Sequence, residues 1–121
     1  MDTALWILQA IMAAVYLSAG IIKLFLEKDK LEKQFSWVKE FNRFSLKIIG
    51  GLEILGAFGL VLPEVTGIVP VLTPAAALGI SLIMIMATIF HNRRKEMDSV
   101  VITQLLFVIA LFIAYGRIFL V

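Results

Sequence analysis

The stretch YLSAGIIKLF, Tyr16 to Phe25, lies inside an apolar run over residues 4–26 in which Lys23 is the only charged side chain. A helix needs about 20 apolar residues to cross the hydrocarbon core of a bilayer, and this run is long enough. Because lipid offers an ammonium group neither water nor a counter-ion, Lys23 needs a polar partner or a path to the membrane surface. Its position therefore bears on both the membrane topology and a candidate site.

The whole chain shares this apolar character. Of its 121 residues, 61% are hydrophobic and 17% are charged, and the mean hydropathy is +1.00. A soluble domain carries about 25% charged residues, so this composition indicates a membrane protein. Four membrane-spanning helices use about 80 residues, which leaves room for short loops but for no separate soluble domain. The net charge of +2 comes from basic residues beside apolar segments, and no nucleic-acid partner is expected.

The apolar segments predict an all-α fold: a polytopic membrane protein whose four-transmembrane-helix bundle forms a single domain over residues 1–121. The predicted spans cover residues 4–26, 45–62, 74–91 and 100–119. Pro63 and Pro70 are expected to interrupt the chain between the second and third spans. Thr73 followed by Pro74 predicts the start of the third span, with Thr73 as its N-cap.

The segment between the first two spans combines charges with aromatic residues. Apolar side chains, among them Trp37, Phe41 and Phe44, recur with helical spacing, whereas Lys30 and Lys33 lie largely on the other side. This pattern predicts an amphipathic helix in the membrane interface, where aromatic side chains are favoured. The alternative is an ordinary loop helix packed against the end of the bundle.

The basic residues predict how the bundle is oriented. Those of the first and third loops are Lys28, Lys30, Lys33, Lys39, Arg43, Arg93, Arg94 and Lys95, and Lys47 lies just inside the second span. The second loop contains none. The positive-inside rule therefore places loops one and three in the cytoplasm and both termini outside, in a bacterial-type plasma membrane. Trp37 is expected at the inner interface, and Arg117, near the outer end of the fourth span, is expected to snorkel to the outer one.

With this orientation, polar residues of all four spans meet at the cytoplasmic end of the bundle. They are Lys23, Glu53, Thr88, His91 and Gln104, with Tyr16 deeper in the first span. Because Glu53 has too short a side chain to snorkel, it is expected to face inward and either pair or stay protonated. Lys23 is its natural partner, and His91 is the next. The cluster fits either a ligand site or a structural role, and Lys23 alone also fits a lysine that snorkels to the headgroups.

Several kinds of chemistry are not indicated by the sequence. The chain has no cysteine, which excludes disulfide chemistry and cysteine-ligated clusters. His91 is its only histidine, so no haem with two histidine ligands is expected from this chain alone. No nucleotide-binding, zinc-protease or catalytic-triad pattern occurs. We therefore predict no catalytic residue and no metal site, and a role that is not enzymatic on its own is favoured.

A series of short motifs runs through the length of the chain. They are GIIKL at 20–24, WVKEF at 37–41, IGGLEILG at 49–56, LTPAAALG at 72–79, IFH at 89–91 and AYGR at 114–117. In this order and at these spacings they resemble the DoxX-like family. The resemblance implies a compact four-helix membrane bundle. It implies that Lys23, Glu53, His91 and Arg117 correspond to the polar positions of the family's motifs. Family patterns often place Asn where this chain has Gln104.

The resemblance implies less about activity. The family name comes from a small subunit associated with a terminal quinol oxidase and with thiosulfate:quinone oxidoreduction, and other relatives are linked to membrane-associated oxidative-stress complexes. A more distant eukaryotic relative, NACHO, resembles an assembly chaperone for acetylcholine receptors.

Three hypotheses about function remain open at this stage. The first is an accessory component of a membrane redox system that binds quinone or lipid at the polar cluster. The second is a non-catalytic chaperone or scaffold that docks to a larger membrane protein or to a second copy of itself, since small-residue pairs favour helix contacts in lipid. The third is a carrier of small solutes or protons. It ranks last because few polar residues are expected to continue the path to the outer face.

Overall fold

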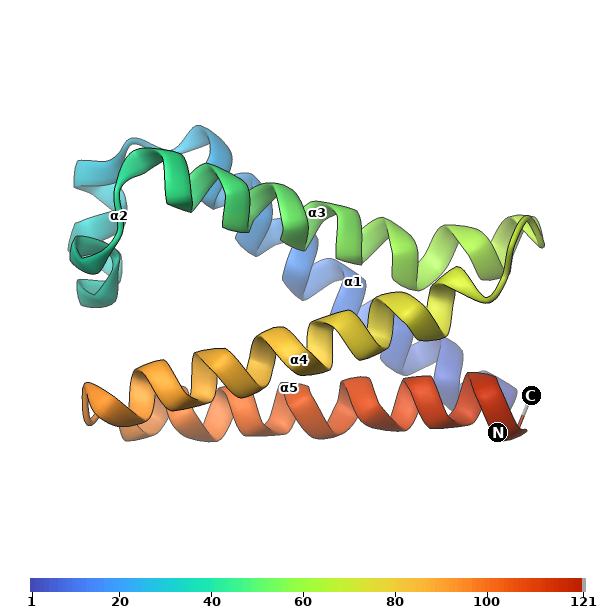
Figure 1. The fold of residues 1–121 in the computed structure, drawn as a ribbon. Helices are drawn as coiled ribbons and strands as arrows, with labels where there is room; N and C mark the ends of the chain where they lie inside the picture. The colour runs from blue at the N-terminus through green and yellow to red at the C-terminus, as the bar shows by residue number, and fades with distance from the viewer. Residues whose placement is uncertain (121) are drawn as a thin grey trace.

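The structure, a computed structural model, describes residues 1–120 as helices joined by short connections (Figure 1). In chain order the elements are α1 (Asp2–Phe25), α2 (Lys28–Gln34), the 3-10 helix η1 (Ser36–Glu40), α3 (Arg43–Thr66), α4 (Leu72–Arg93), α5 (Met97–Tyr115) and the π-helical stretch η2 (Gly116–Leu120). Four helices, the last of them including η2, are long and apolar enough to cross a membrane. The predicted all-α fold with four spans is therefore confirmed.

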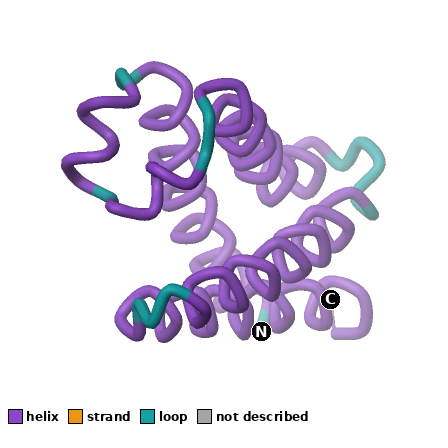
Figure 2. Tube along the Cα trace, turned by 60° about the vertical axis from the view of Figure 1, so that its left-hand side comes forward, coloured by secondary structure: helices purple, strands orange, loops and turns teal. Residues whose placement is uncertain are grey.

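The spans pair as two antiparallel hairpins. α1 packs along α3, α4 packs along α5, and contacts between α3 and α4 join the hairpins. Both termini and the α3–α4 connection lie at one end of the bundle, which we call the terminal end (Figure 1). The opposite end, with the α1–α3 and α4–α5 connections, is the loop end. The hairpins diverge towards the loop end, and Figure 2 shows their separation from a second direction.

The connection between α3 and α4 is shorter than the sequence predicted. α3 continues through Pro63 to Thr66 and ends at Gly67, whose φ of 72° is a left-handed conformation that glycine adopts without strain. Pro63 has no backbone N–H group, so the carbonyl group four residues earlier lacks its helical hydrogen bond. Membrane helices tolerate such a loss. The predicted N-cap at Thr73 is wrong. α4 begins at Leu72, and the Thr73 hydroxyl is buried without a hydrogen-bond partner.

The amphipathic segment forms two short helices, α2 and η1, instead of one continuous helix. The break falls at Phe35, whose backbone is extended. A small second core of Leu31, Val38 and Leu46 packs the segment against the start of α3. Arg43 ties the same region to α1, because its guanidinium donates hydrogen bonds to the carbonyl groups of Leu24, in the last turn of that helix, and of Leu26, its C-cap. The segment is therefore fixed to the α1–α3 hairpin.

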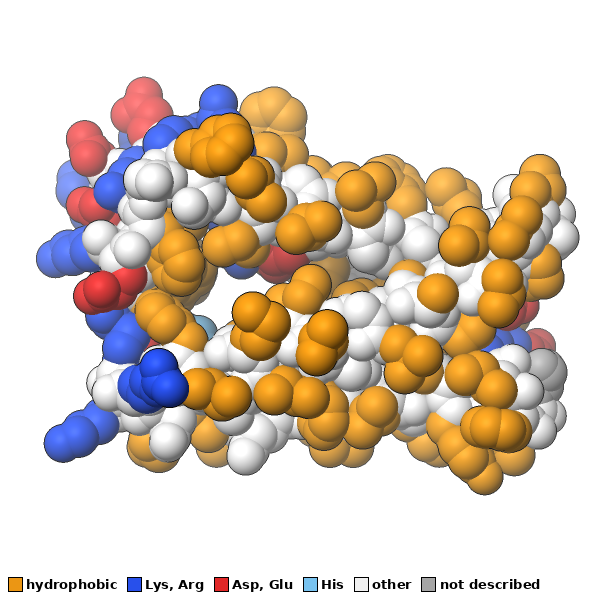
Figure 3. All heavy atoms as spheres, in the orientation of Figure 1, with side chains coloured by type: hydrophobic (Ala, Val, Ile, Leu, Met, Phe, Trp, Pro, Cys, Tyr) orange, Lys and Arg blue, Asp and Glu red, His pale blue; other side chains and the backbone are white. Residues whose placement is uncertain are grey.

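The outer surface of the four spans is apolar. Large hydrophobic side chains are exposed on every span, for example Ile11, Leu55, Leu82 and Leu105. Figure 3 shows hydrophobic atoms along the length of the bundle and charged side chains gathered mainly at the loop end. A continuous apolar belt with a charged end is the surface that a lipid bilayer requires.

Candidate functional site

A close contact between α1 and α3 positions the two charged residues of the spans. A Cβ atom on Gly20 would lie 2.5 Å from the carbonyl oxygen of Gly50, and one on Gly50 would lie 2.8 Å from that of Gly20. The backbones therefore approach as closely as small residues allow in membrane helices. Lys23 and Glu53 each follow one of these glycines by three residues, so they lie on the helix faces that make the contact.

Lys23 and Glu53 form an ion pair between α1 and α3. The Nζ atom of Lys23 donates a hydrogen bond to Oε1 of Glu53 at 2.5 Å. The two side chains are 16% and 10% exposed, so the pair lies mostly inside the protein, where an unpaired charge is costly. The pairing predicted from the depth of these residues is present.

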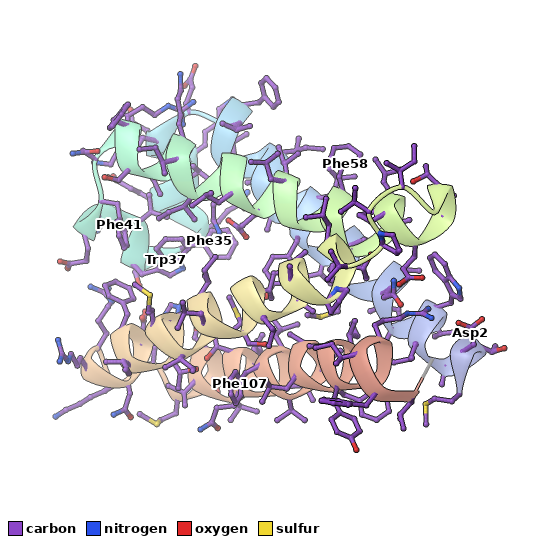
Figure 4. All side chains as sticks on the ribbon, turned by 45° about the vertical axis from the view of Figure 1, so that its right-hand side comes forward. Asp2, Phe35, Trp37, Phe41, Phe58 and Phe107 are labelled. Atoms are coloured by element: carbon purple, nitrogen blue, oxygen red, sulfur yellow. The ribbon has the colours of Figure 1, made fainter. Side chains whose placement is uncertain are left out.

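Trp37 of η1 contacts both this ion pair and the histidine. The Nζ atom of Lys23 lies 5.4 Å from the centroid of the Trp37 ring, within the range of a cation–π contact. The His91 ring of α4 lies edge-on to the same indole, with the ring centroids 6.0 Å apart. Figure 4 shows Phe35, Trp37 and Phe41 grouped at the loop end, whereas Asp2 lies at the opposite end.

His91, predicted as the second candidate partner of Glu53, pairs with Glu96 instead. Its Nδ1 atom lies 2.9 Å from Oε1 of Glu96, and Arg94 Nε donates to the same oxygen at 3.1 Å. The hydrogen bond with His91, supported by Arg94, lowers the pKa of Glu96 below its ordinary value, so this carboxylate keeps its charge to a lower pH than an ordinary glutamate. Arg94 also donates to Glu40 of η1 at 2.7 Å, so the network extends to the other hairpin.

A pocket of about 320 Å³ lies beside the ion pair. Its walls come from α1, α2, η1 and the residue between the last two, namely Ala19, Ile22, Lys23, Leu31, Phe35, Trp37 and Val38. Lys23 supplies the only charged group. Apolar and aromatic walls with one oriented polar group are typical of pockets for small ligands. The divergence of the hairpins appears in Figure 3 as an opening between α3 and α4.

The other predicted cluster members form no hydrogen bond with the ion pair. Thr88 joins α4 to α5 by a hydrogen bond of 2.8 Å with Thr103. Gln104 is exposed on the outer surface of α5, so its predicted place in the cluster is wrong. Tyr16 is buried in the main core, where its hydroxyl group has no hydrogen-bond partner. Within residues 1–120, no cluster of acidic, histidine or cysteine side chains suits a metal ion.

Arg117 does not snorkel to the interface as predicted. Only 2% of its side chain is exposed, and it lies at the terminal end of the bundle. Its Nε atom donates to Gln9 at 2.7 Å, and its Nη1 atom donates to Asp2 at 2.6 Å. The guanidinium also lies 5.1 Å from the ring centroid of Trp6. Gln9 in turn donates to the backbone carbonyl of Leu60 in α3, so three helical segments meet at Arg117.

The sequence holds a signal for this terminal-end network. Asp2, Gln9, Tyr16 and Lys23 are spaced by seven residues, which places them on one stripe of α1. Gln9 and Tyr16 are buried. Polar groups therefore continue along α1 to the terminal end, which corrects the expectation that they gather at one end of the bundle.

Comparison with protein-family models gives a match to the DoxX-like family over residues 7–113. The matched range contains the ion pair, Trp37, His91 and the whole pocket, and it leaves out Asp2 and Arg117. Neither the search of curated proteins nor that of solved structures gives a match.

Proposed function

The chain belongs to the DoxX-like family, and on this premise we propose that it binds a quinone-type amphiphile beside the Lys23–Glu53 pair, as an accessory component of a membrane redox system. The observation that carries this proposal is the pocket, whose one charged group faces an indole inside an otherwise apolar wall. A quinone headgroup needs a hydrogen-bond donor for a carbonyl oxygen and a flat apolar surface for its ring. Lys23 and Trp37 offer these two features side by side.

The ion pair gives Lys23 the properties that such a site needs. Glu53 balances its charge, which allows the ammonium group to stay inside the bundle without a ligand. An ammonium group has three donor hydrogens, so Lys23 can keep its bond to Glu53 and donate another to a carbonyl oxygen. The apolar tail of the ligand would pass between the diverging hairpins into the bilayer.

Two single-tryptophan variants test this proposal. Trp6→Phe leaves Trp37 beside the pocket, and Trp37→Phe leaves Trp6 at the terminal end as a matched control. Titration of each protein in nanodiscs with a short-chain benzoquinone should quench Trp37 saturably and Trp6 only in proportion to quinone concentration. Adding Lys23→Met to the Trp6→Phe background should weaken the saturable component. Equal, linear quenching of both tryptophans would refute quinone binding at this pocket.

A cytoplasmic location of the loop end is part of the proposal. All lysine and arginine residues except Lys23 and Arg117 lie in the loops at that end or in the helical turns beside them, and such residues are retained on the cytoplasmic side. The absence of cysteine from the sequence makes this testable by labelling in intact cells. A membrane-impermeant thiol reagent should label Ile68→Cys and should leave Lys39→Cys unlabelled until the cells are opened. The reverse pattern would place the loop end outside.

A scaffold role is a second candidate, favoured by a groove on the lipid-facing side of α3 and α4. The groove has a volume of about 250 Å³, and Gly56, Ala76 and Gly79 contribute small residues to its lining. A Cβ atom added at Gly79 would meet nothing within 4 Å, so there is room for another helix to approach. Gly79→Leu should abolish co-purification of a larger membrane protein or of a second copy, and it should leave quinone titration unchanged. Retained co-purification would refute docking at this groove.

A further inference from the structure

We propose that η1 is a releasable latch between the two hairpins, and that its release opens the Lys23–Glu53 pair to the loop-end surface. The latch consists of Ser36, Trp37 and Glu40 of η1, together with Phe41, the residue that follows it. The residues that it contacts on the other hairpin are Phe90, His91, Arg94 and Glu96. The idea that the latch regulates ligand entry rests on the proposed function, whereas its role in joining the hairpins does not.

The hydrogen bonds between the hairpins are concentrated at the two ends of the bundle. Within residues 1–120, four side-chain hydrogen bonds connect the α1–α3 hairpin, with its loop, to the α4–α5 hairpin and η2. Arg117 makes two of them at the terminal end. The others are Ser36–Glu96 at 3.3 Å and Glu40–Arg94 at 2.7 Å, both at the loop end. Because both loop-end bonds start from η1, this short helix is the polar connection at that end.

The two ends differ in burial, which makes one a hinge and the other a latch. The Arg117 side chain is 2% exposed, whereas Glu40 and Arg94 are 55% and 26% exposed. Exposed ion pairs contribute little to stability and are screened by salt. A buried guanidinium with two charge-assisted or amide partners is much harder to separate. The hairpins should therefore stay joined at the terminal end when the loop end opens.

Packing decides which hairpin the latch moves with. Val38 of η1 is buried against Leu31 and Leu46, so η1 belongs to the α1–α3 hairpin. The aromatic contacts with α4 are an edge-on contact of Trp37 with His91 and a tilted contact of Phe90 with Phe41, the residue after η1, at a centroid distance of 5.3 Å. Contacts of this kind are individually weak, so release requires separation from α4 without unfolding of η1.

Trp37 links the latch to the buried pair. Its ring lies over the Lys23 ammonium group and contacts His91, which is bonded to Glu96 at the loop end. The same residue forms part of the pocket wall. When η1 leaves α4, water and ligands at the loop-end surface gain a route to Trp37 and to the ion pair behind it.

Spin labels can measure the latch directly because the chain has no native cysteine. The labels are placed at Lys39→Cys on η1 and Arg93→Cys on α4, both exposed positions. The variant Ser36→Ala/Glu40→Lys removes both loop-end hydrogen bonds and sets a lysine against Arg94. Its inter-label distances in nanodiscs should be longer and more widely distributed than those of the parent protein. Raising the salt concentration should shift the parent protein in the same direction.

Glu32→Lys is the matched control. It makes the same charge change in the same loop, but it breaks only the pair with Lys28 inside α2. Its distance distribution should equal that of the parent protein. If the Ser36→Ala/Glu40→Lys distribution is also unchanged, η1 is not a latch.

Access is tested without quinone. In the Trp6→Phe background, Ser36→Ala/Glu40→Lys should increase the collisional quenching of Trp37 by aqueous acrylamide several-fold, and Glu32→Lys should not. Longer distances with unchanged acrylamide quenching would refute the access role of the latch. Neither the distance measurement nor the acrylamide measurement uses quinone. If quinone does not bind, the proposed ligand is refuted, and these two measurements still decide whether η1 is a latch.

Discussion

Gly20 and Gly50 face each other across the α1–α3 contact so closely that neither residue has room for a Cβ atom. This contact determines the geometry of the candidate site, because Lys23 and Glu53 each lie three residues beyond one of the glycines. In antiparallel helices, those two positions lie on opposite sides of the crossing. Each side chain then leans towards the N-terminus of its own helix, which brings the ammonium and carboxylate groups together.

Substitution of either glycine by alanine should therefore disturb the ion pair. Gly20→Ala forces the helices apart, and we expect it to lower the stability in detergent by about 1–3 kcal/mol, the usual cost of overpacking. The matched control is Gly51→Ala, one residue from Gly50, where an added Cβ atom would meet nothing within 4 Å. Thermal unfolding followed by circular dichroism should show a lower Tm for Gly20→Ala only. Equal Tm values would mean that the helices do not approach as closely as described.

Removal of one partner of the ion pair should cost more than its conservative replacement. Glu53→Ala leaves the Lys23 ammonium group without a counter-ion inside the bundle, which we expect to cost about 3 kcal/mol and to lower Tm. Glu53→Gln keeps a hydrogen-bond acceptor and should lower Tm less. Glu32→Ala is the control, because the Lys28 and Glu32 side chains are 34% and 28% exposed, more than those of the buried pair, and their i,i+4 pair should contribute little. Three indistinguishable Tm values would refute the structural importance of the buried pair.

The pairing of Lys23 with Glu53 could be predicted because it depends on the depth of each residue in the membrane. The number of spans and the placement of basic residues determine the direction of each helix, and direction determines which residues share a level in the membrane. The rotation of a helix about its axis is harder to predict. α5 is apolar all round, and lipid is as apolar as the bundle interior, so hydropathy does not distinguish Thr103, which faces inward, from Gln104, which faces outward.

The terminal-end network was missed for a different reason. The prediction for Arg117 rests only on its place near the outer end of the fourth span, which is consistent with an interfacial position. Its burial depends on the path of α1, which brings Asp2 and Gln9 beside η2, a tertiary feature that the local sequence does not contain. The seven-residue spacing of polar residues in α1 was the available signal.

The lowered pKa of Glu96 predicts how the loop-end network responds to acid. A carboxylate whose pKa is lowered by folding contributes stability above its unfolded pKa, about 4.3 for glutamate. That contribution is lost as the pH falls through the lower, folded pKa. The groups that face Glu96 are His91, Arg94 and the Ser36 hydroxyl, and Arg94 also contacts Glu40.

Comparison with Glu96→Gln isolates this effect from the other carboxylates. At neutral pH the variant should have the lower Tm, and the difference from the parent protein should shrink as the pH falls below about 4. Thermal unfolding between pH 7 and pH 3 measures both proteins under the same conditions. A difference in Tm that stays constant across this range would show that the charge of Glu96 does not stabilise the loop end.

The burial of Arg117 predicts that lysine cannot replace it. Lysine keeps the charge but lacks the planar fork that reaches Gln9 and Asp2 together, so Arg117→Lys should lower the stability by about 2 kcal/mol. Arg94→Lys is the matched control, because Arg94 also reaches two acceptors, Glu96 and Glu40, but its side chain is 26% exposed, and this substitution should lower Tm less. If thermal unfolding in detergent shows that both substitutions are tolerated equally, Arg117 is an interfacial anchor whose charge alone matters, and the terminal end cannot be the hinge of the bundle.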